Sequence, residues 1–332
     1  MSGVGSGFWA KLKRPIFALA PMANVTDAAF RQVIAKYGKP AVMWTEFVSC
    51  DGLCSKGRER LLEDFWFTPA ERPIVAQIFG SNPDNFTKCA QLIKQLGFDG
   101  IDINMGCPDR NVEKQGGGAA LIKNPKLAQE VIKATQAGAD DLPVSVKTRL
   151  GYDTDILEDW LPKLLAAAPA AVTIHARTRK EMSKVPARWE RVTRAVEIRD
   201  TLESKTLILG NGDIDSLALA RQRVAQTGAD GVMIGRGIFG DPWFFNEQKG
   251  AVSVREKLEV MLEHTKLYEK IYKQSRNFAT MKKHYKAYVN GFDGAKELRI
   301  KLMAAEDFGG VNEVTKKCLI HNIDQLTVMA QD

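Results

Sequence analysis

Short apolar segments alternate along the chain with longer stretches that carry helix signals. Asn82-Pro83 and Asn124-Pro125 each place a capping side chain before a proline in the first helical turn. We expect the two helices that follow to end at Gly97 and Gly138. Eight apolar segments precede residue 245, namely Ile16–Ala20, Ala41–Thr45, Ile74–Phe79, Gly100–Ile103, Val144–Thr148, Ala171–Ile174, Thr206–Leu209 and Gly231–Ile234.

Strands that alternate with helices pair in parallel through right-handed crossovers, and eight such units over about 240 residues suit a closed barrel. A doubly wound open sheet is the main rival fold. After residue 245 the pattern becomes purely helical, so we predict an α/β fold with a (β/α)8 TIM barrel in residues 1–248 and a small all-helical domain in residues 249–332. The helices expected there are Val254–Gln274, Phe278–Asn290, Ala295–Ala305 and Leu319–Ala330.

The composition is that of a soluble globular protein, with 332 residues of which 45% are hydrophobic and 26% charged. No apolar run approaches the roughly 18 residues of a membrane span, and Met1–Arg14 lacks the apolar core of a secretory signal. Five cysteines without a framework spacing favour a reducing, cytoplasmic setting. Cys50 and Cys54 have no partner pair nearby, so we expect both to face the core and expect no metal site.

The net charge of +7 is mild, and it permits a polyanionic partner without requiring one. Basic residues are concentrated between His264 and Lys286, where seven of them stand against one acid, Glu269. This stretch is either a surface for nucleic acid or an ordinary solvated helix face. Its tyrosines, which would stack on bases in the first case and belong to the core in the second, are Tyr268, Tyr272 and Tyr285.

Polar residues stand at the predicted carboxyl end of nearly every strand. In a barrel these ends meet on one face, where active sites lie, so we expect the side chains to share a site. Each residue alone also has a plainer explanation as a cap, a surface charge or a satisfied buried group. The residues are Glu46, Gln77, Asn104, Cys107, Lys147, Arg149, His175, Arg177, Asn211, Asp213 and Arg236.

Cys107 stands in a tight turn directly after the fourth predicted strand, between Gly106 and Pro108. The glycine run Gly116–Gly118 follows closely and permits a loop that moves or lets backbone approach a ligand. Cys107 is therefore either a reactive thiol on a loop or a buried structural cysteine.

Glycines after strands seven and eight, Gly212 and Gly235, fit a phosphate-binding site to which Arg236 adds a fixed charge. Lys147 on a neighbouring strand could face the electron-rich end of a flavin or a carbonyl oxygen, and a Schiff base is its competing use. Gly235–Gly240 formally matches the dinucleotide fingerprint G-x-G-x-x-G. That fingerprint opens a first βαβ unit, whereas this one closes the eighth, so we disfavour a Rossmann domain.

Taken together, these motifs resemble the tRNA-dihydrouridine synthase family, and most closely its bacterial B-type branch. The resemblance covers about residues 15 to 305 in the family's order, and Lys283-His284 and Gly294–Arg299 look like the signature of its helical domain. The matching stretches are Ala20–Asp27, Thr45–Ser49, Gln77–Gly80, Asp102–Pro108, Gly116–Pro125, Val146–Gly151, His175–Arg179, Asn211–Ile214 and Gly235–Gly237.

The resemblance implies a flavin enzyme that takes electrons from NADPH into FMN and reduces uridine in tRNA to dihydrouridine. A hydride would reach C6 of uracil, and Cys107 would protonate C5 as general acid. The resemblance also implies that Asn104, Arg149, Arg177, Lys282 and Lys283 contact the tRNA substrate. The residues implied for the FMN site are Pro21, Met22, Ala23, Gln77, Lys147, His175, Asn211, Gly212, Asp213, Gly235 and Arg236.

The sequence departs from the family pattern at three places. Asn24 stands where the family usually has glycine, and Ala176 stands where glycine commonly follows the histidine. The loop Lys180–Trp189 lacks the usual tyrosine–glycine–alanine run before its tryptophan. These departures bear on the contacts with uridine and tRNA rather than on the flavin site.

Two other functions remain open at this stage. A flavin barrel acting on a free pyrimidine, like dihydroorotate dehydrogenases, would not need the basic tail. An RNA-binding barrel that has lost its chemistry would not need Cys107 and the phosphate site. We expect a monomer with tRNA and NADPH as its partners.

Overall fold

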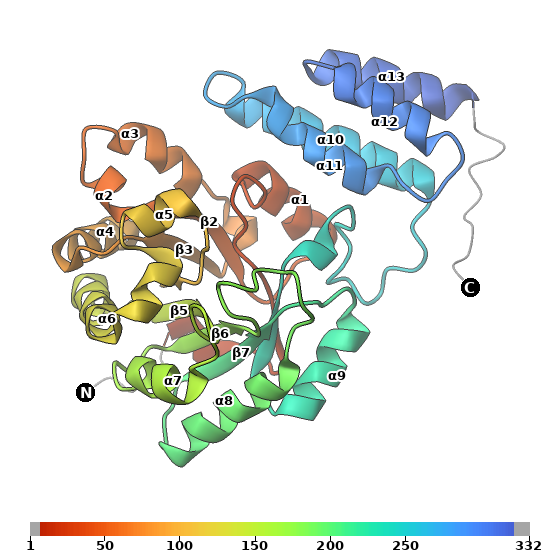
Figure 1. Cartoon of the computed structure of the whole chain (residues 1–332). Coiled ribbons are helices and arrows are strands. Elements are labelled where there is room, and N and C mark those ends of the chain that lie inside the picture. Colours follow the sequence, from red (N-terminus) through yellow and green to blue (C-terminus); the bar gives the residue numbers. More distant parts are fainter. Residues whose placement is uncertain (1–6, 322–332) are drawn as a thin grey trace. The chain divides into compact units, whose positions relative to one another are not determined.

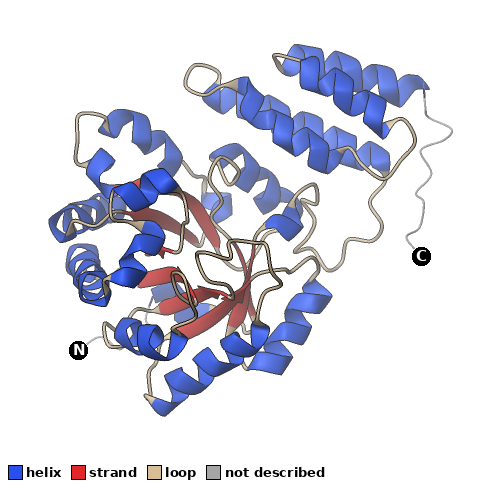
Figure 2. Cartoon of the chain, in the orientation of Figure 1, coloured by secondary structure: helices blue, strands red, loops and turns tan. Residues whose placement is uncertain are grey.

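The computed structural model describes residues 7–321, and its strands form one parallel sheet that curls into a barrel (Figures 1 and 2). The strand order is β1-β8-β7-β6-β5-β4-β3-β2. All seven pairings are parallel. The strands are β1 (Ile16–Leu19), β2 (Met43–Ser49), β3 (Ile74–Phe79), β4 (Gly100–Met105), β5 (Val144–Arg149), β6 (Ala171–His175), β7 (Leu207–Asn211) and β8 (Gly231–Ile234).

Contacts between β1 and the start of β2 close the barrel. Ala18 forms a parallel bridge with Val42, and the backbone N–H of Leu19 donates to the carbonyl of Val42 over 3.1 Å. On the other side of β1, Gly231 in β8 lies so close to Ile16 that an added Cβ would stand 2.1 Å from its carbonyl oxygen. The predicted closed barrel is confirmed, because an open sheet would leave β1 and β2 unjoined.

Helices cover the outside of the strands (Figure 1). The predicted caps are present, since Asn82 accepts from two backbone N–H groups of α4 and Asn124 accepts from the N–H of Leu127 in α6. The helices that surround the barrel are α2 (Cys50–Leu53), α3 (Arg58–Leu61), α4 (Pro83–Gln95), α5 (Arg110–Lys114), α6 (Pro125–Ala139), α7 (Leu157–Leu165), α8 (Trp189–Thr201) and α9 (Leu217–Thr227).

Gly138 does not end its helix as expected, because α6 continues through Ala139. An added Cβ at Gly138 would lie 2.3 Å from the carbonyl oxygen of Thr87 in α4. The glycine therefore lets α4 and α6 approach closely, and packing rather than capping requires it.

A second compact unit combines residues 27–39 with the residues from Gly237 onward. The sequence analysis placed the division at 248/249 and assigned the first helix to the barrel, whereas the contacts group α1 with the C-terminal helices. Tyr272 Oη accepts from the N–H of Ala28 over 3.0 Å, and Lys36 pairs with Glu263 over 2.8 Å. The helices are α1 (Ala28–Tyr37), α10 (Val254–Tyr272), α11 (Lys282–Tyr288), α12 (Ala295–Ala304) and α13 (Phe308–His321).

The final helix differs from the prediction. It begins at Phe308 rather than Leu319, and positions 322–330 of the predicted segment lie outside the described residues. Its early part carries Gly309 and Gly310, which disfavour a helix by propensity, so packing overrides propensity here. Val311 and Thr315 on this helix are fully buried.

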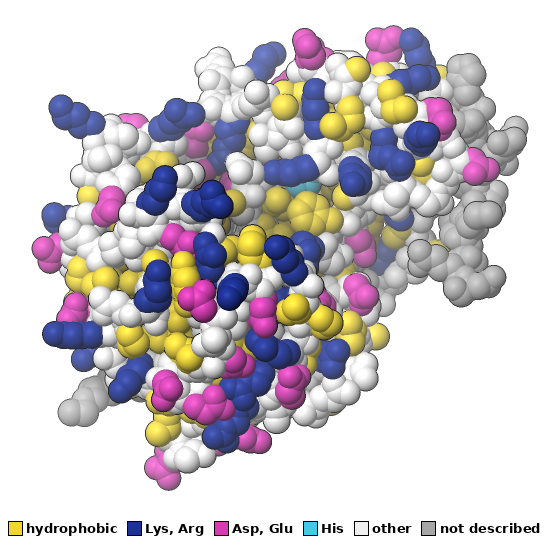
Figure 3. Space-filling view, in the orientation of Figure 1, with side chains coloured by type: hydrophobic (Ala, Val, Ile, Leu, Met, Phe, Trp, Pro, Cys, Tyr) yellow, Lys and Arg dark blue, Asp and Glu magenta, His cyan; other side chains and the backbone are white. Residues whose placement is uncertain are grey.

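Burial excludes one of the two alternatives for the tyrosines and shows that one expectation about the cysteines was wrong. Tyr268, Tyr272 and Tyr285 form the core of the second unit and are at most 1% exposed, so they cannot stack on bases. Cys54 is exposed rather than facing the core, whereas Cys50 is fully buried. Within residues 7–321 no helix has the length and apolarity needed to span a bilayer. The face drawn in Figure 3 mixes Lys and Arg side chains with Asp and Glu side chains.

Candidate active site

The carboxyl ends of the strands place the predicted polar side chains within reach of one another, beginning with Lys147 and Asn211. Lys147 Nζ in β5 donates to Asn211 Oδ1 in β7 over 3.1 Å, and Asn211 Nδ2 donates to the carbonyl of Met233 over 2.7 Å. Burial, with the charge of nearby Arg149 as a smaller cause, lowers the pKa of Lys147 to about 8. Lys147 is therefore a cation held in a poorly solvated place, where an anionic ligand group would stabilise its charge.

A buried amide network lies under the ends of β3 and β4. Gln77 Nε2 donates to Asp102 Oδ2 over 2.6 Å, and Asn104 Nδ2 donates to Gln77 Oε1 over 3.1 Å. Ser145 Oγ donates to the second oxygen of Asp102 over 2.5 Å. Burial raises the pKa of Asp102 to about 6 despite these donors. Asp102 fixes the orientation of the Gln77 amide, a role that the sequence analysis did not assign to it.

Asn104 also shapes the turn that carries Cys107. Its Oδ1 accepts from the backbone N–H groups of Gly106 and Cys107 over 3.1 and 2.9 Å. The Cys107 thiol is partly buried, and burial raises its pKa above the ordinary value, so the thiol stays protonated at neutral pH. Gly118 packs against this turn, because an added Cβ would stand 2.7 Å from the carbonyl oxygen of Cys107.

Arg149 ties the Cys107 turn to the loop after β6. Its Nε donates to the carbonyl of Gly106 over 2.7 Å. Its Nη1 donates to the carbonyls of Thr178 and Met182 over 3.0 and 3.1 Å. Burial lowers the pKa of Arg149 to about 10, yet the guanidinium remains charged at neutral pH. The side chain thus acts on the shape of the site by joining two loops.

His175, Arg177 and Asp213 form a second polar group at the ends of β6 and β7. Arg177 Nη1 lies 3.1 Å from His175 Nε2, and Arg177 Nη2 pairs with Asp213 Oδ2. Burial, together with the surrounding arginines and Lys147, holds the pKa of His175 well below its ordinary value. The imidazole is therefore neutral, and it can accept or donate a hydrogen bond without bringing a charge.

Arg236 stands at the edge of this group. It is 67% exposed in its side chain and lies 3.7 Å from Asp213 Oδ1. An added Cβ at Gly235 would touch nothing nearer than Met22 Sδ at 3.6 Å. A side chain at position 235 would therefore be in ordinary van der Waals contact with the segment after β1, and Arg236, only loosely paired with Asp213, has a guanidinium that can meet an anion.

Pro21, Met22 and Ala23 follow β1, and Ala23 is exposed. Asn24, the departure from the family's glycine, has φ 55°. Asparagine tolerates this left-handed conformation better than most residues, so the turn is kept without glycine. Its backbone N–H donates to Glu46 Oε1 at the end of β2.

The atypical loop Lys180–Trp189 contributes to the site through its backbone. Arg177 Nε donates to the carbonyl of Val185 over 2.6 Å, and the N–H of Ala187 donates to Asp213 Oδ2 over 2.8 Å. Backbone carbonyl and N–H groups do not depend on which side chain a residue carries, proline's missing N–H excepted. The loop can therefore support the site without the family's tyrosine–glycine–alanine run.

Lys282 and Lys283 begin α11 in the second unit, and both are partly exposed. The structure therefore separates the predicted substrate contacts into residues of the barrel and residues of the helical unit.

The sequence analysis missed Arg179 and Glu113. Arg179 Nε donates to Glu113 Oε1 over 2.8 Å, and Nη2 pairs with the other oxygen over 2.5 Å. Arg179 lies within the quoted His175–Arg179 motif, which marks it as a candidate. No local signal marks Glu113 as its partner, because the pairing joins segments far apart in the sequence.

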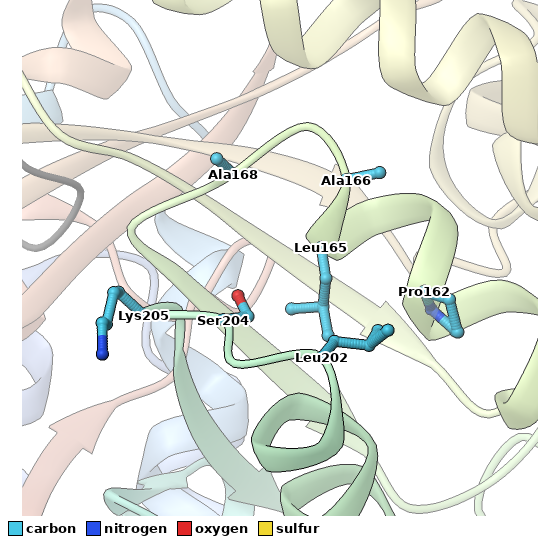
Figure 4. Close-up of a pocket in the computed structure, with 7 residues that line it drawn as sticks. All are labelled: Pro162, Leu165, Ala166, Ala168, Leu202, Ser204 and Lys205. Atoms are coloured by element: carbon cyan, nitrogen blue, oxygen red, sulfur yellow. The ribbon is translucent and has the colours of Figure 1, made fainter.

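A hollow of about 380 Å³ between the ends of α7 and α8 is not part of this site (Figure 4). Ala168 lies just before β6 and Lys205 just before β7, so the hollow is at the amino ends of these strands. Its remaining lining is formed by Pro162, Leu165, Ala166, Leu202 and Ser204. No group of His, Cys, Asp and Glu within residues 7–321 is arranged to hold a metal ion.

Comparison with known proteins identifies relatives over most of the chain. The model of the dihydrouridine synthase family matches residues 18–324. A Bacillus subtilis protein called probable tRNA-dihydrouridine synthase 2 is 43% identical over 299 residues, which cover 89% of this chain and 91% of the relative. A Staphylococcus epidermidis protein called probable tRNA-dihydrouridine synthase is 42% identical over 310 residues, covering 92% and 94%.

Among solved structures, the histamine dehydrogenase of Rhizobium sp. 4-9 has a TM-score of 0.53 at 14% identity, covering 76% of this chain and 48% of that protein. A 2-naphthoyl-CoA reductase has the same TM-score at 12% identity, covering 70% and 49%. The chain spans about half the length of these proteins, and the likeness shows the barrel fold alone.

Proposed function

The chain belongs to the dihydrouridine synthase family, and we propose that it reduces uridines in tRNA to 5,6-dihydrouridine with FMN as cofactor and NADPH as reductant. The names of the relatives and the family match over residues 18–324 support the tRNA reaction. The observation that carries the mechanism is the Cys107 thiol, held protonated in a turn at the carboxyl end of β4. FMN and NADPH come from the resemblance to the family, and the polar side chains gathered at the strand ends support the flavin.

The residues at the strand ends fit a phosphorylated flavin. The glycine after β8, Gly235, and the exposed Arg236 suit the phosphate, because backbone N–H groups and a guanidinium both donate to anions. Lys147 would face the electron-rich edge of the flavin ring. Because Lys147 is poorly solvated, its charge would interact strongly with negative charge on that edge. Gln77 and Asn211 would donate to or accept from the ring amides. The full set proposed for FMN is Pro21, Met22, Ala23, Gln77, Lys147, His175, Asn211, Gly212, Asp213, Gly235 and Arg236.

When bound, FMN would supply the hydride that C6 of uracil receives. The chain's own contribution is the proton for C5, which Cys107 would donate as general acid. A thiol whose pKa is raised by burial stays protonated until it is needed, and a positioned acid of this kind typically accelerates a reaction on the order of 10²–10⁴-fold. Asn104 would have two roles. It holds the Cys107 turn through Oδ1, and it would present its amide near the uracil ring.

The substrate is proposed to reach this site as a base taken out of its stack. Arg149 and Arg177 would shape the base pocket through the loops that they join, and Lys282 and Lys283 would contact tRNA phosphates from the helical unit. The burial of Tyr268, Tyr272 and Tyr285 leaves these tyrosines no part in base stacking.

The test compares substrates on one enzyme preparation. Protein reduced by NADPH under anaerobic conditions should be reoxidised by tRNA from cells that lack the protein, and dihydrouridine should appear at defined positions in that tRNA. Free uridine, UMP and orotate should reoxidise it far more slowly. Equal rates with orotate would favour the free-pyrimidine alternative, and a colourless protein without reductase activity would favour a binding role.

A further inference from the structure

Three thiols gather on one side of the barrel, beside the carboxyl end of β2. Cys50 opens α2, Cys54 directly follows this helix, and Cys89 lies in α4. The sulfur atoms of Cys54 and Cys89 are 4.0 Å apart, and Cys89 Sγ lies 3.6 Å from the carbonyl oxygen of Cys50. The proposed reaction uses none of these thiols.

Access to the three thiols differs. Cys54 is exposed, Cys89 is 1% exposed and Cys50 is fully buried. Cys54 and Cys89 both border a surface hollow of about 350 Å³, whose rim also carries the cations Arg58 and Lys88. An exposed thiol, a covered thiol behind it and two cations beside them lie together in one hollow.

The three thiols differ in how readily they lose a proton. The neighbouring Cys50, and to a smaller extent Cys54, lowers the pKa of Cys89 below its ordinary value. The pKa of Cys50 is raised well above the ordinary value, chiefly by burial. Burial, with Cys89 as a smaller cause, raises the pKa of Cys54 to about 11, so the negative charge is best held at Cys89. Cys54 becomes a thiolate only when its proton passes to Cys89, whose sulfur lies 4.0 Å away.

We propose that Cys54 and Cys89 are a redox-active dithiol that reacts with low-molecular-weight disulfides carrying carboxylates. Cys54 meets the oxidant because it is exposed, and Cys89 resolves the product because it lies next to Cys54. Arg58 and Lys88 attract the carboxylates of the incoming disulfide.

The reaction balances as two thiol–disulfide exchanges. The Cys54 thiolate attacks one sulfur of the disulfide RSSR, which forms Cys54–S–S–R and releases RS⁻. The Cys89 thiolate then attacks the Cys54 sulfur, which forms the Cys54–Cys89 disulfide and releases the second RS⁻. The two protein thiols lose two electrons, RSSR gains them, and the two thiol protons pass to the released thiolates.

The local structure permits the bond to form. A disulfide needs the sulfurs about 2.05 Å apart, so they must approach by roughly 2 Å. Cys54 directly follows a helix of only four residues, and the residues from Ser55 to Arg60 after it are exposed. Cys54 can therefore move toward α4, while the hydrogen bond of 2.7 Å from Asn85 Nδ2 to Asp51 Oδ1 keeps the two helices together.

Peptide mapping of the full chain tests the pairing. The reduced protein is treated with glutathione disulfide, remaining thiols are alkylated, and tryptic peptides are identified by tandem mass spectrometry, whose fragments distinguish Cys50 from Cys54 on the peptide that they share. A linked Cys54–Cys89 peptide with Cys50, Cys107 and Cys318 alkylated is the expected result. A link from Cys54 to Cys50, or glutathione only on Cys107 or Cys318, would overturn the proposal.

Single variants test the order of events. Cys89→Ser should stop the reaction at the mixed disulfide, with glutathione trapped on Cys54. Cys54→Ser should take up no glutathione at Cys89, because that thiol is covered. Cys318→Ser, a change at a partly buried cysteine of α13, should behave as the parent. Glutathione on Cys89 at the parent's rate in Cys54→Ser would contradict the assigned roles.

A charge test asks whether the hollow selects its oxidant. The double variant Arg58→Gln with Lys88→Gln should react with glutathione disulfide roughly three- to tenfold more slowly than the parent, as expected for two exposed charges. Its rate with uncharged 2-hydroxyethyl disulfide should stay the same. Equal slowing with both reagents would indicate a structural effect, and no slowing with either would remove the two cations from the proposal.

Discussion

Arg179 holds Glu113 through two parallel hydrogen bonds, with 2.8 Å between Arg179 Nε and Glu113 Oε1. Glu113 lies in α5, the short helix after the Cys107 turn, and Arg179 lies in the loop after β6. Both side chains are largely buried, at 12% and 25% exposure. The pair therefore anchors the segment that carries the proposed acid to a separate part of the barrel.

Breaking this pair should slow the reaction with tRNA without disturbing flavin reduction. Glu113→Gln keeps the shape of the side chain but removes the charge-assisted bonds, which contribute roughly 1.5–3 kcal/mol in comparable cases. We expect the rate of flavin reoxidation by tRNA to fall roughly tenfold, and stopped-flow absorbance measures it. Glu190→Gln, at an exposed carboxylate in α8, is the control. An unchanged reoxidation rate would show that Cys107 does not depend on this anchor.

Cys107→Ala should separate the two half-reactions. The variant should bind FMN, and NADPH should bleach the flavin as in the parent, because the thiol is assigned to the uracil. Reoxidation by tRNA should slow on the order of 10²–10⁴-fold with the loss of the general acid. Anaerobic stopped-flow follows both phases on one sample, with Cys318→Ala as the control. Normal tRNA reoxidation without NADPH bleaching would assign Cys107 to the other half-reaction.

Arg236→Ala should weaken FMN binding by about tenfold or more. A charge-assisted contact with phosphate contributes roughly 1.5–3 kcal/mol, and the weak 3.7 Å pairing with Asp213 leaves Arg236 available for it. Flavin fluorescence during titration of the apoprotein gives the dissociation constant. Arg194→Ala, an exposed arginine on α8, should leave it unchanged. If Arg236→Ala retains flavin as tightly as the parent, the phosphate lies elsewhere.

Charge reversal at the start of α11 should weaken the interaction with tRNA. Lys282→Glu with Lys283→Glu should raise the apparent KM for tRNA and flatten its dependence on salt, because each lost phosphate contact removes about one released counterion. Steady-state rates at several salt concentrations measure both effects. The matched control is Lys126→Glu with Lys133→Glu, a pair of exposed lysines on α6. A parent-like salt slope in the first variant would place the docking surface elsewhere.

Two buried histidines should make the helical unit sensitive to acid. His264 and His284 are packed with ring centroids 4.8 Å apart, and their Nε2 atoms have no hydrogen-bond partner within residues 7–321. Burial lowers the pKa of His264 to about 3 and that of His284 well below its ordinary value. Below about pH 6.5 the two histidines are protonated in the unfolded chain but stay neutral in the folded chain. The free energy of unfolding therefore falls as the pH drops.

Each such histidine should cost about 1.4 kcal/mol of stability per pH unit between about pH 6.5 and the lowered pKa. His264→Phe keeps a ring beside Phe30, and it should reduce the slope of stability against pH by about one histidine's share. Urea unfolding at pH 7.5, 6.5 and 5.5 measures that slope. The same slope in parent and variant would mean that His264 is protonated in the folded state or does not contribute.

The sequence by itself determined the barrel and the polar residues that gather at its strand ends. Apolar runs of strand length between capped helices leave few alternatives to parallel pairing, and parallel closure then brings every strand's carboxyl end to one face. Lys147 in β5 and Asn211 in β7 are two strand-and-helix units apart in the chain. They are joined by a hydrogen bond of 3.1 Å because the predicted topology brings the carboxyl ends of both strands to one face. Local sequence signals were enough to place such residues at the carboxyl ends of their strands.

Tertiary structure alone decided which surfaces are buried and which distant residues meet. The sequence does not decide whether the tyrosines in the basic stretch of α10 and α11 are exposed or buried. Packing against α1 buries them. α1 itself follows β1 in the chain, as a barrel helix would, yet its contacts with Tyr272 and Glu263 place it in the second unit. The pairs Arg179–Glu113 and Cys54–Cys89 arise in the same way, since side-chain contacts over long sequence separations depend on the packing of whole elements and leave no pattern in the local sequence.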